Sequence, residues 1–185
     1  MNIALKEWNL LGEALLSARQ AILLRKGGIL EANNEFELEH RRFLLFPTFV
    51  HQDVKMLKPQ WRAGVTNVRD EPERVTLKGF AEVVRVWEVP SRAAMDELFD
   101  LHMWDTPLVD MRFAYRPEKP LYLVVVRGWR LREAVELANT AEYAGCKSWV
   151  TLEESVDTTG AVAAMEEGKL AGIVERVGQT FQSKK

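Results

Sequence analysis

Short apolar runs rich in β-branched and aromatic residues recur along this chain, and glycine or proline bounds several of them. They lie at 20–25, 43–46, 80–89, 121–126 and 148–152. Runs of this length and composition between turn-forming residues are typical of β-strands. Residues 121–126 are the most apolar of them and predict a central strand. Because no regular alternation of strand and helix separates the runs, the pattern argues against a doubly wound fold.

Three stretches predict helices. An apolar stripe at alternating steps of four and three indicates an N-terminal helix, and its members are Ala4, Trp8, Leu11, Leu15 and Ala18. Ser91 stands where an N-cap belongs before a middle helix, and residues 163–181 have the apolar spacing of a C-terminal helix. Residues 133–144 are rich in alanine and free of proline, which indicates a further helix, with an extended loop as the alternative. Residues 52–75 and 103–119 are interpreted as long connections.

The predicted fold class is therefore α+β, with N-terminal, middle and C-terminal helices flanking a mixed, largely antiparallel sheet. The alternatives for the sheet are an open form and one curled into a partial barrel. A chain of 185 residues fits one domain with a sizeable core. We expect a single α+β domain over 1–155 and a helical extension over 156–185 that packs on it.

The amino-acid composition says more about the cellular compartment of the protein than about its function. The single cysteine excludes an internal disulfide and fits a reducing cytoplasm. No apolar run approaches the roughly 20 residues of a membrane helix, so no membrane association is predicted. The net charge of −2 gives no overall attraction to nucleic acid, but residues 40–92 carry ten Lys and Arg against six Asp and Glu. This local excess predicts a basic face, and a solvated loop region is the alternative.

Residues 22–52 hold the densest group of titratable side chains. His40 and His51 bracket the apolar run at 43–46, and a loop with four glutamates precedes them. Basic side chains near a glycine pair, which permits close backbone approach, predict a site for an anionic ligand or nucleic acid. The expected ligand-binding residues are Lys26, Gly27, Gly28, His40, Arg41, Arg42, His51 and Arg127.

A second hypothesis is a metal-dependent hydrolase or nuclease that uses the His40/His51 region. Imidazole and thiolate suit zinc, and the candidate ligands are His40, His51, His102 and Cys146. The catalytic candidates are Glu39, Asp53 and Cys146: Asp53 begins an Asp-x-Lys tripeptide of the restriction-nuclease type, and Lys147 adjoins Cys146. Such tripeptides also arise by chance in a chain with 27 acidic residues.

The cofactor and partner predictions rest on motifs that the sequence lacks. It contains no G-x-G-x-x-G, Walker loop, H-E-x-x-H or C-x-x-C motif, so no cofactor is predicted, and a divalent metal is the alternative. A third hypothesis is a protein-interaction scaffold. Whether the partner is another protein or a second copy of the chain stays open.

Five sequence blocks resemble an uncharacterised bacterial family, domain of unknown function 1802. They are LLRKGGI at 23–29, EHRRFLLFPTFVHQ at 39–52, LHMWD at 101–105, PLYLVVVRGWRL at 120–131 and YAGCKSW at 143–149. The resemblance extends from Ala4 to about Leu152. The family has no established activity. Its association with restriction-endonuclease catalytic domains of the Mrr type implies a role near restriction–modification or DNA processing.

Overall fold

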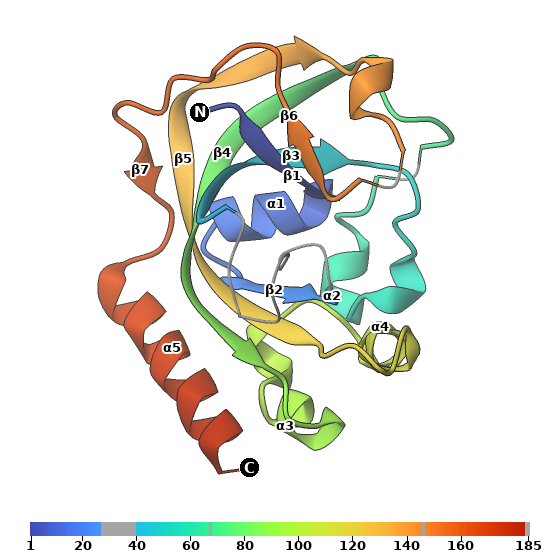
Figure 1. Cartoon of the computed structure of the whole chain (residues 1–185), viewed down its shortest axis with the longest axis vertical. Coiled ribbons are helices and arrows are strands. Elements are labelled where there is room, and N and C mark those ends of the chain that lie inside the picture. Colours follow the sequence, from blue (N-terminus) through green and yellow to red (C-terminus); the bar gives the residue numbers. More distant parts are fainter. Residues whose placement is uncertain (27–39, 67, 146, 184–185) are drawn as a thin grey trace.

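The computed structural model describes residues 1–26, 40–66, 68–145 and 147–183, which form a mixed α+β fold (Figure 1). Its seven strands are β1 (Ile3–Trp8), β2 (Ile22–Arg25), β3 (Arg42–Thr48), β4 (Arg74–Glu88), β5 (Tyr122–Ala138), β6 (Trp149–Thr151) and β7 (Val162–Ala163). They form one sheet in the order β2-β5-β4-β3-β1-β6, with β7 paired to β5. Only β1 and β3 run parallel. The sheet is open and mostly antiparallel, so the predicted fold class is confirmed.

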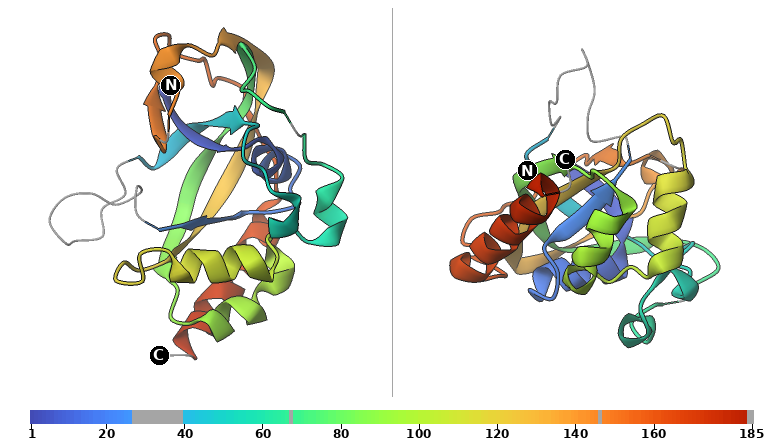
Figure 2. Two further views of the ribbon diagram at one scale, coloured as in Figure 1. Left: turned by 90° about the vertical axis from the view of Figure 1, so that its right-hand side faces the viewer. Right: turned by 90° about the horizontal axis from the view of Figure 1, so that it is seen from below.

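Helices cover the sheet and its ends. They are α1 (Asn9–Leu16), α2 (Pro59–Arg62), α3 (Arg92–Glu97), α4 (Thr106–Ala114) and α5 (Glu167–Gln182), with 3₁₀ turns at Val54–Met56, Phe99–Leu101 and Ala141–Tyr143. Helix α1 lies inside the curve of the sheet, where it contacts β3 and β5, and α5 packs on α3 and β5 (Figures 1 and 2). Within the described ranges, none of the helices combines the length and apolar character needed to cross a membrane.

The sheet curls strongly, and this curl positions the site described below. Arg25 at the end of β2 forms an ion pair with Glu7 of β1, although β5, β4 and β3 lie between these two strands in the sheet order. The Arg25 guanidinium also lies 3.4 Å from the carbonyl oxygen of Lys6. Register shifts between β4 and β5, at Leu77/Gly79 and Val83/Arg85, add local twist.

Two apolar clusters fill the two faces of the sheet. Alternate residues of a strand point to opposite faces, and β3 follows this rule: Phe43 and Leu45 join the cluster around α1, whereas Leu44 and Phe46 join the other. The second cluster lies beneath the segment that carries β6. All four of these β3 side chains are buried. Because both faces of β3 are covered, its sequence is a continuous apolar run.

The prediction of a helix that begins at Ala4 is wrong. Residues Ile3–Trp8 form β1, and α1 begins only at Asn9. β1 is flanked by β3 on one side and β6 on the other, and Ala4 and Leu5 are completely buried. Pairing on both edges and burial on both faces override a weak local helical pattern.

The helix predicted over 133–144 is wrong, and the alternative of an extended loop holds only after Ala138, where the chain leaves β5 and makes the 3₁₀ turn at Ala141–Tyr143. Strand β5 continues to Ala138, with Val135 opposite Leu77 and Leu137 opposite Val75 in β4. Cross-strand pairing of these side chains outweighs the helical preference of alanine. The connections expected at 103–119 and 52–75 contain α4 and α2 respectively.

Other local predictions are confirmed. Strands lie within or across all five apolar runs. The Ser91 hydroxyl accepts a hydrogen bond of 3.2 Å from the backbone N–H of Ala94, as an N-cap should. The C-terminal helix is α5, which places Leu170, Val177 and Phe181 in the core.

Candidate functional site

A narrow cationic pocket lies where β1 ends. It is small, about 30 Å³, and it is lined by Glu7, Trp8, Leu11, Leu24, Trp104, Leu108 and Arg112. Arg25 adjoins it through the ion pair with Glu7. We call these eight residues the Arg112 pocket. β1, β2, α1 and α4 all contribute to it, so it exists only in the folded chain.

Helix α4 presents Arg112 to this pocket. Leu108 and Arg112 are four residues apart and therefore share one face of the helix. Asp105 fixes the start of α4, because its carboxylate accepts a 2.8 Å hydrogen bond from the Thr106 N–H. At the other end, the Lys26 ammonium donates to the carbonyls of Arg112 and Phe113, at 2.9 Å each. A cation at this end complements the helix dipole.

Among the residues that the structure describes, the pocket holds two guanidinium groups but one carboxylate. Glu7 is paired with Arg25, and the two side chains are only 16% and 12% exposed. Burial lowers the pKa of Arg112; nearby Glu7 opposes this effect and Arg25 adds to it. An arginine keeps its proton in spite of such a shift. The site therefore carries an excess positive charge in a poorly solvated position, where an anion is strongly favoured.

The charged groups also lack some hydrogen-bond partners. The Nε atoms of both Arg25 and Arg112 are buried, and neither has an acceptor among the described residues. Leaving a buried charged donor unpaired costs about 1–3 kcal/mol or more. A bound anion would supply the missing acceptors.

Two tryptophans form the aromatic part of the pocket. Trp104 is 5% exposed and Trp8 is partly buried. Trp104 is held in place by a β-bridge to Leu57. The two indole rings form apolar walls beside the guanidinium groups, and at 5% exposure Trp104 has no free face on which a base could stack.

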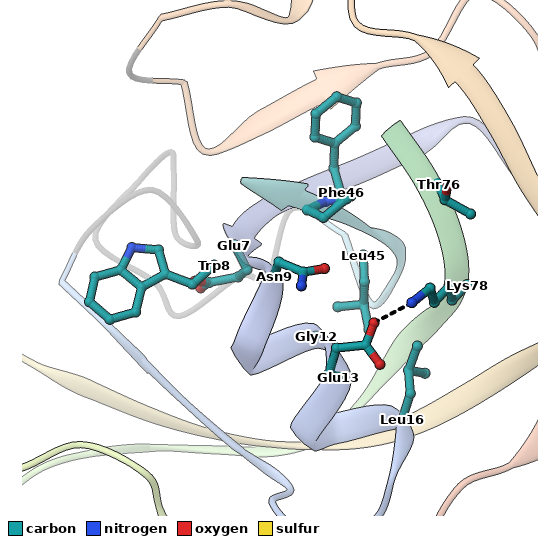
Figure 3. A pocket seen from close by; sticks show the side chains of 11 residues that line it. Glu7, Trp8, Asn9, Gly12, Glu13, Leu16, Leu45, Phe46, Thr76 and Lys78 are labelled. Carbon is teal, nitrogen blue, oxygen red and sulfur yellow. Dashed lines mark hydrogen bonds and ion pairs between the residues drawn. The ribbon is translucent and has the colours of Figure 1, made fainter. Parts of the chain in front are cut away.

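A second hollow lies on the other side of the β1 end (Figure 3). It runs between the start of α1, the end of β3 and the first half of β4, and it has two connected parts that share Asn9, Pro47, Thr76 and Lys78. We call it the α1 groove. Glu7 and Trp8 line both the α1 groove and the Arg112 pocket. In Figure 3 the Trp8 side chain points away from the other labelled side chains, and Lys78 and Glu13 form an ion pair of 2.6 Å.

The structure brings two of the predicted arginines together, but away from this pocket. Arg42 and Arg127 lie in one row of the sheet, on either side of Glu82. The Arg42 guanidinium lies over the Phe80 ring at 5.0 Å, and Arg127 forms an ion pair with Glu167. Arg41 is exposed beside them. Lys26 lies next to the Arg112 pocket, where its ammonium holds the end of α4.

The three histidines do not share a pocket. His40 precedes β3 and contacts the Trp149 ring at 5.0 Å, whereas His51 follows β3 and is exposed. The seven residues of β3 separate these positions by roughly 20 Å. His102 is buried in the connection between α3 and α4.

Asp53 accepts a 2.9 Å hydrogen bond from the Lys55 N–H and so starts the 3₁₀ turn at Val54–Met56. The described ranges contain no group of three His, Asp or Glu side chains arranged to hold a metal ion. Gly27, Gly28, Glu39 and Cys146 lie outside the residues that the structure describes.

Sequence reasoning missed Glu7, Arg25 and Arg112 as site residues. Arg25 ends a correctly predicted strand, directly before Lys26. The sequence therefore placed Arg25 correctly but did not indicate its ion-pair partner. Arg112 lies in a stretch interpreted as a connection. Asp105 followed by Pro107 is a helix-start signal that would have placed Leu108 and Arg112 on one face.

Comparison with known proteins gives a family and two distant structures. The family described as "Domain of unknown function (DUF1802)" matches residues 4–176. No curated protein matches the chain. Among solved structures, two mutant forms of the ZmASCH protein from Zymomonas mobilis are similar, with TM-scores of 0.48 and 0.47 and identities of 9% and 10%. The alignments cover 94% of this chain in each case, and 94% and 96% of those chains.

Proposed function

The chain belongs to the DUF1802 family, and we propose that it binds a phosphate-bearing ligand, a nucleotide or a nucleic acid, whose phosphate group occupies the Arg112 pocket. One observation carries the proposal: within the described part of the chain, two largely buried guanidinium groups, Arg25 and Arg112, face a single carboxylate, Glu7. A monoanionic group placed there would balance the charge of the pocket.

The donor chemistry favours phosphate. Guanidinium groups are planar and match phosphate oxygens with paired N–H donors. The unpartnered Nε atoms of Arg25 and Arg112 are the donors that such oxygens would satisfy. A carboxylate ligand would meet the same charge requirement, but it offers two acceptor oxygens where a phosphate monoester offers three, so it would satisfy fewer of these donors.

Calorimetric titration with nucleoside 5′-monophosphates, the matching nucleosides and acetate tests the proposal. The monophosphates should bind, and the nucleosides and acetate should bind at least tenfold more weakly. Arg112→Gln should weaken monophosphate binding by about tenfold or more, because a hydrogen bond to a charged group contributes about 1.5–3 kcal/mol. Arg132→Gln is the matched control, since Arg132 is an exposed arginine of β5 outside the pocket. Equal affinity of the wild type and Arg112→Gln for the monophosphates would contradict the proposal.

Salt provides a second test. Binding to a phosphate should weaken as ionic strength rises. A constant affinity between about 50 and 200 mM salt would argue against recognition of phosphate.

A further inference from the structure

We infer that the edge of β4 at residues 74–78 binds an extended acidic segment of a partner protein as an added β-strand. This interaction surface is separate from the Arg112 pocket and does not depend on the proposed function. Three observations carry the inference: β4 has an unpaired edge, a groove lies along this edge, and the exposed side chains on it are basic.

The first part of β4 has a neighbouring strand on one side only. β5 pairs with β4 from Arg74 to Glu88. On the other side, the ladder with β3 joins only residues 42–44 to residues 80–82. Among the described residues, the stretch 74–78 therefore lacks a second neighbour. A strand edge of this kind is a template for pairing with another chain.

The backbone of this edge directs hydrogen-bonding groups away from β5. The Asn139 N–H donates to the Glu73 carbonyl, so residue 73 faces β5. Residues along an antiparallel strand face its neighbour alternately, so the N–H and C=O groups of Arg74 and Thr76 point to the other side. The described parts of the chain provide no hydrogen-bond partner for them there.

The sequence itself ends the ladder between β3 and β4. Continuing its register past Leu44 would place Pro47 opposite Leu77, and proline has no N–H to donate. At the same level, a register shift between Leu77 and Gly79 interrupts the regular course of β4. The two strands therefore separate, and Pro47 lines the hollow between them.

The wider part of the α1 groove, about 380 Å³, lies along this edge. In Figure 3, Thr76 and Lys78 of β4 lie across the hollow from the end of β3. Beyond Pro47 the groove is lined by Phe49, whose N–H donates a 3.0 Å hydrogen bond to the carboxylate of Glu71. This bond fixes the segment before β4 to the end of β3, so the groove has two supported walls.

The charges on the edge select an acidic partner. Arg74 and Lys78 line the wider part, and no Asp or Glu of the described residues does. Arg74 pairs with Glu136 and Lys78 with Glu13, but all four side chains are at least 43% exposed. Ion pairs with this exposure are weak and can be exchanged. Carboxylates on an added strand, directly opposite the two cations, would form favourable cross-strand pairs.

The same charges argue against a second copy of the chain. Antiparallel pairing of two β4 edges about Thr76 would place Arg74 of each copy opposite Lys78 of the other. Like charges in directly opposite positions destabilise a sheet, and cations on an edge prevent its self-association. The occupant that fits is a strand from a different protein with acidic residues at alternate positions.

A synthetic peptide of seven alternating valines and glutamates is the probe. Fluorescence anisotropy would compare it with an analogue that carries lysine in place of glutamate and with one that is N-methylated at every second residue. The glutamate peptide should bind, and both analogues should bind at least tenfold more weakly. Its binding should also slow the amide hydrogen exchange of Thr76 at least tenfold, because this N–H becomes bonded.

Two substitutions test the edge from the side of the protein. Thr76→Pro removes a backbone donor and should weaken binding of the glutamate peptide at least tenfold. Arg74→Gln should weaken it about threefold, the size of one cross-strand charge pair. Arg132→Gln is the matched control, since Arg132 is an exposed arginine of β5 away from the groove. Circular dichroism checks the folding of each variant.

Absence of binding by the glutamate peptide would overturn the inference. Equal binding of the lysine analogue would do the same for the charge argument on which the choice of partner rests. Full affinity of the N-methylated analogue, or unchanged exchange at Thr76, would exclude strand addition. These measurements use the wild-type protein, so they decide the matter even where Thr76→Pro does not fold. Phosphate binding in the Arg112 pocket is unaffected by any of these outcomes.

Discussion

At the scale of single residues, two buried bases lie close together: Lys58, directly before α2, and His102, in the connection between α3 and α4. The Lys58 ammonium donates hydrogen bonds to the carbonyls of Phe99 and His102. Burial lowers the pKa of Lys58 to about 8, against the opposing effect of Asp100 and Asp105. Burial also lowers the pKa of His102 to about 3, and the charge of Lys58 adds to this effect. His102 is therefore neutral in the folded protein at physiological pH.

His102 should make the fold sensitive to acid. In the unfolded chain its pKa is about 6.5, so the unfolded state takes up a proton first and stability falls as pH drops from 6.5 toward 3. Between pH 7 and 4.5 this single group should lower the free energy of unfolding by roughly 2–3 kcal/mol. The His102→Leu variant lacks this titrating group. Its free energy of unfolding should therefore fall less than that of the wild type over the same pH interval, and the difference should be about this amount. Urea unfolding of both proteins at the two pH values measures it, and equal losses would contradict the assignment.

At the scale of secondary-structure elements, α1 depends on tertiary contacts more than on its own sequence. It has eight residues, too few for an isolated helix. Its C-terminal end is held by cations from elsewhere, since Arg130 donates to the Leu16 carbonyl and Lys169 to the Ala18 carbonyl. On its inner side, Leu15 and Gly128 of β5 come into close contact.

Two glycine substitutions should have opposite effects on this element. Gly12→Ala should raise the free energy of unfolding by about 0.5–1 kcal/mol, because the position is helical and open. Gly128→Ala should lower it by roughly 1–3 kcal/mol, because its Cβ would lie 2.7 Å from the Leu15 carbonyl oxygen. Chemical denaturation of the two variants tests the pair. A destabilising Gly12→Ala would show that the space above α1 is filled.

The N-cap of α3 gives a second test at this scale. Ser91→Ala removes the acceptor of the Ala94 N–H and should cost about 1 kcal/mol. Ser91→Asp keeps an acceptor at the cap and should retain most of the wild-type stability. A cost of the same size in both variants would indicate that the hydroxyl acts in some other way.

At the scale of the whole molecule, the C-terminal segment is tied to the N-terminal one. Met1 and Val156 exchange two hydrogen bonds, of 2.8 and 2.7 Å, and the N–H of Leu152 donates to the Asn2 carbonyl. Further along, Ala164 donates to the Gly128 carbonyl of β5. Met165, Leu170, Val177 and Phe181 belong to the same apolar cluster as β5 and α1.

Removal of residues 156–185 should therefore not leave a stable domain. It would expose the apolar side chains of β5 and α3 that α5 covers, at about 25 cal/mol for each Å². We expect the chain that ends at residue 155 to lose its cooperative thermal transition, whereas a chain that ends at Ser183 should unfold like the full-length protein. A cooperative transition in the shorter chain would establish 1–155 as an independent domain.

Residues of the candidate site that are neighbours in the sequence could be predicted, whereas those that are far apart in the sequence could not. Lys26 is a neighbour of Arg25, and local reasoning correctly drew attention to this position. Glu7, Arg25 and Arg112 come from three separate elements, and no local pattern relates them. The expected meeting of His40 and His51 failed for the converse reason, because a rigid extended strand holds residues that are close in sequence far apart in space.

The sequence by itself determined what short-range physics controls: the apolar strand at 121–126, the Ser91 cap, the amphipathic pattern of α5 and the family resemblance. The tertiary structure decided the features that depend on contacts with other elements of the fold. Ile3–Trp8 became a strand because β3 and β6 flank it, and residues up to Ala138 stayed extended because β4 pairs with them. The Arg112 pocket formed because the curl of the sheet brings β2 to the end of β1, a contact that only the complete fold can make.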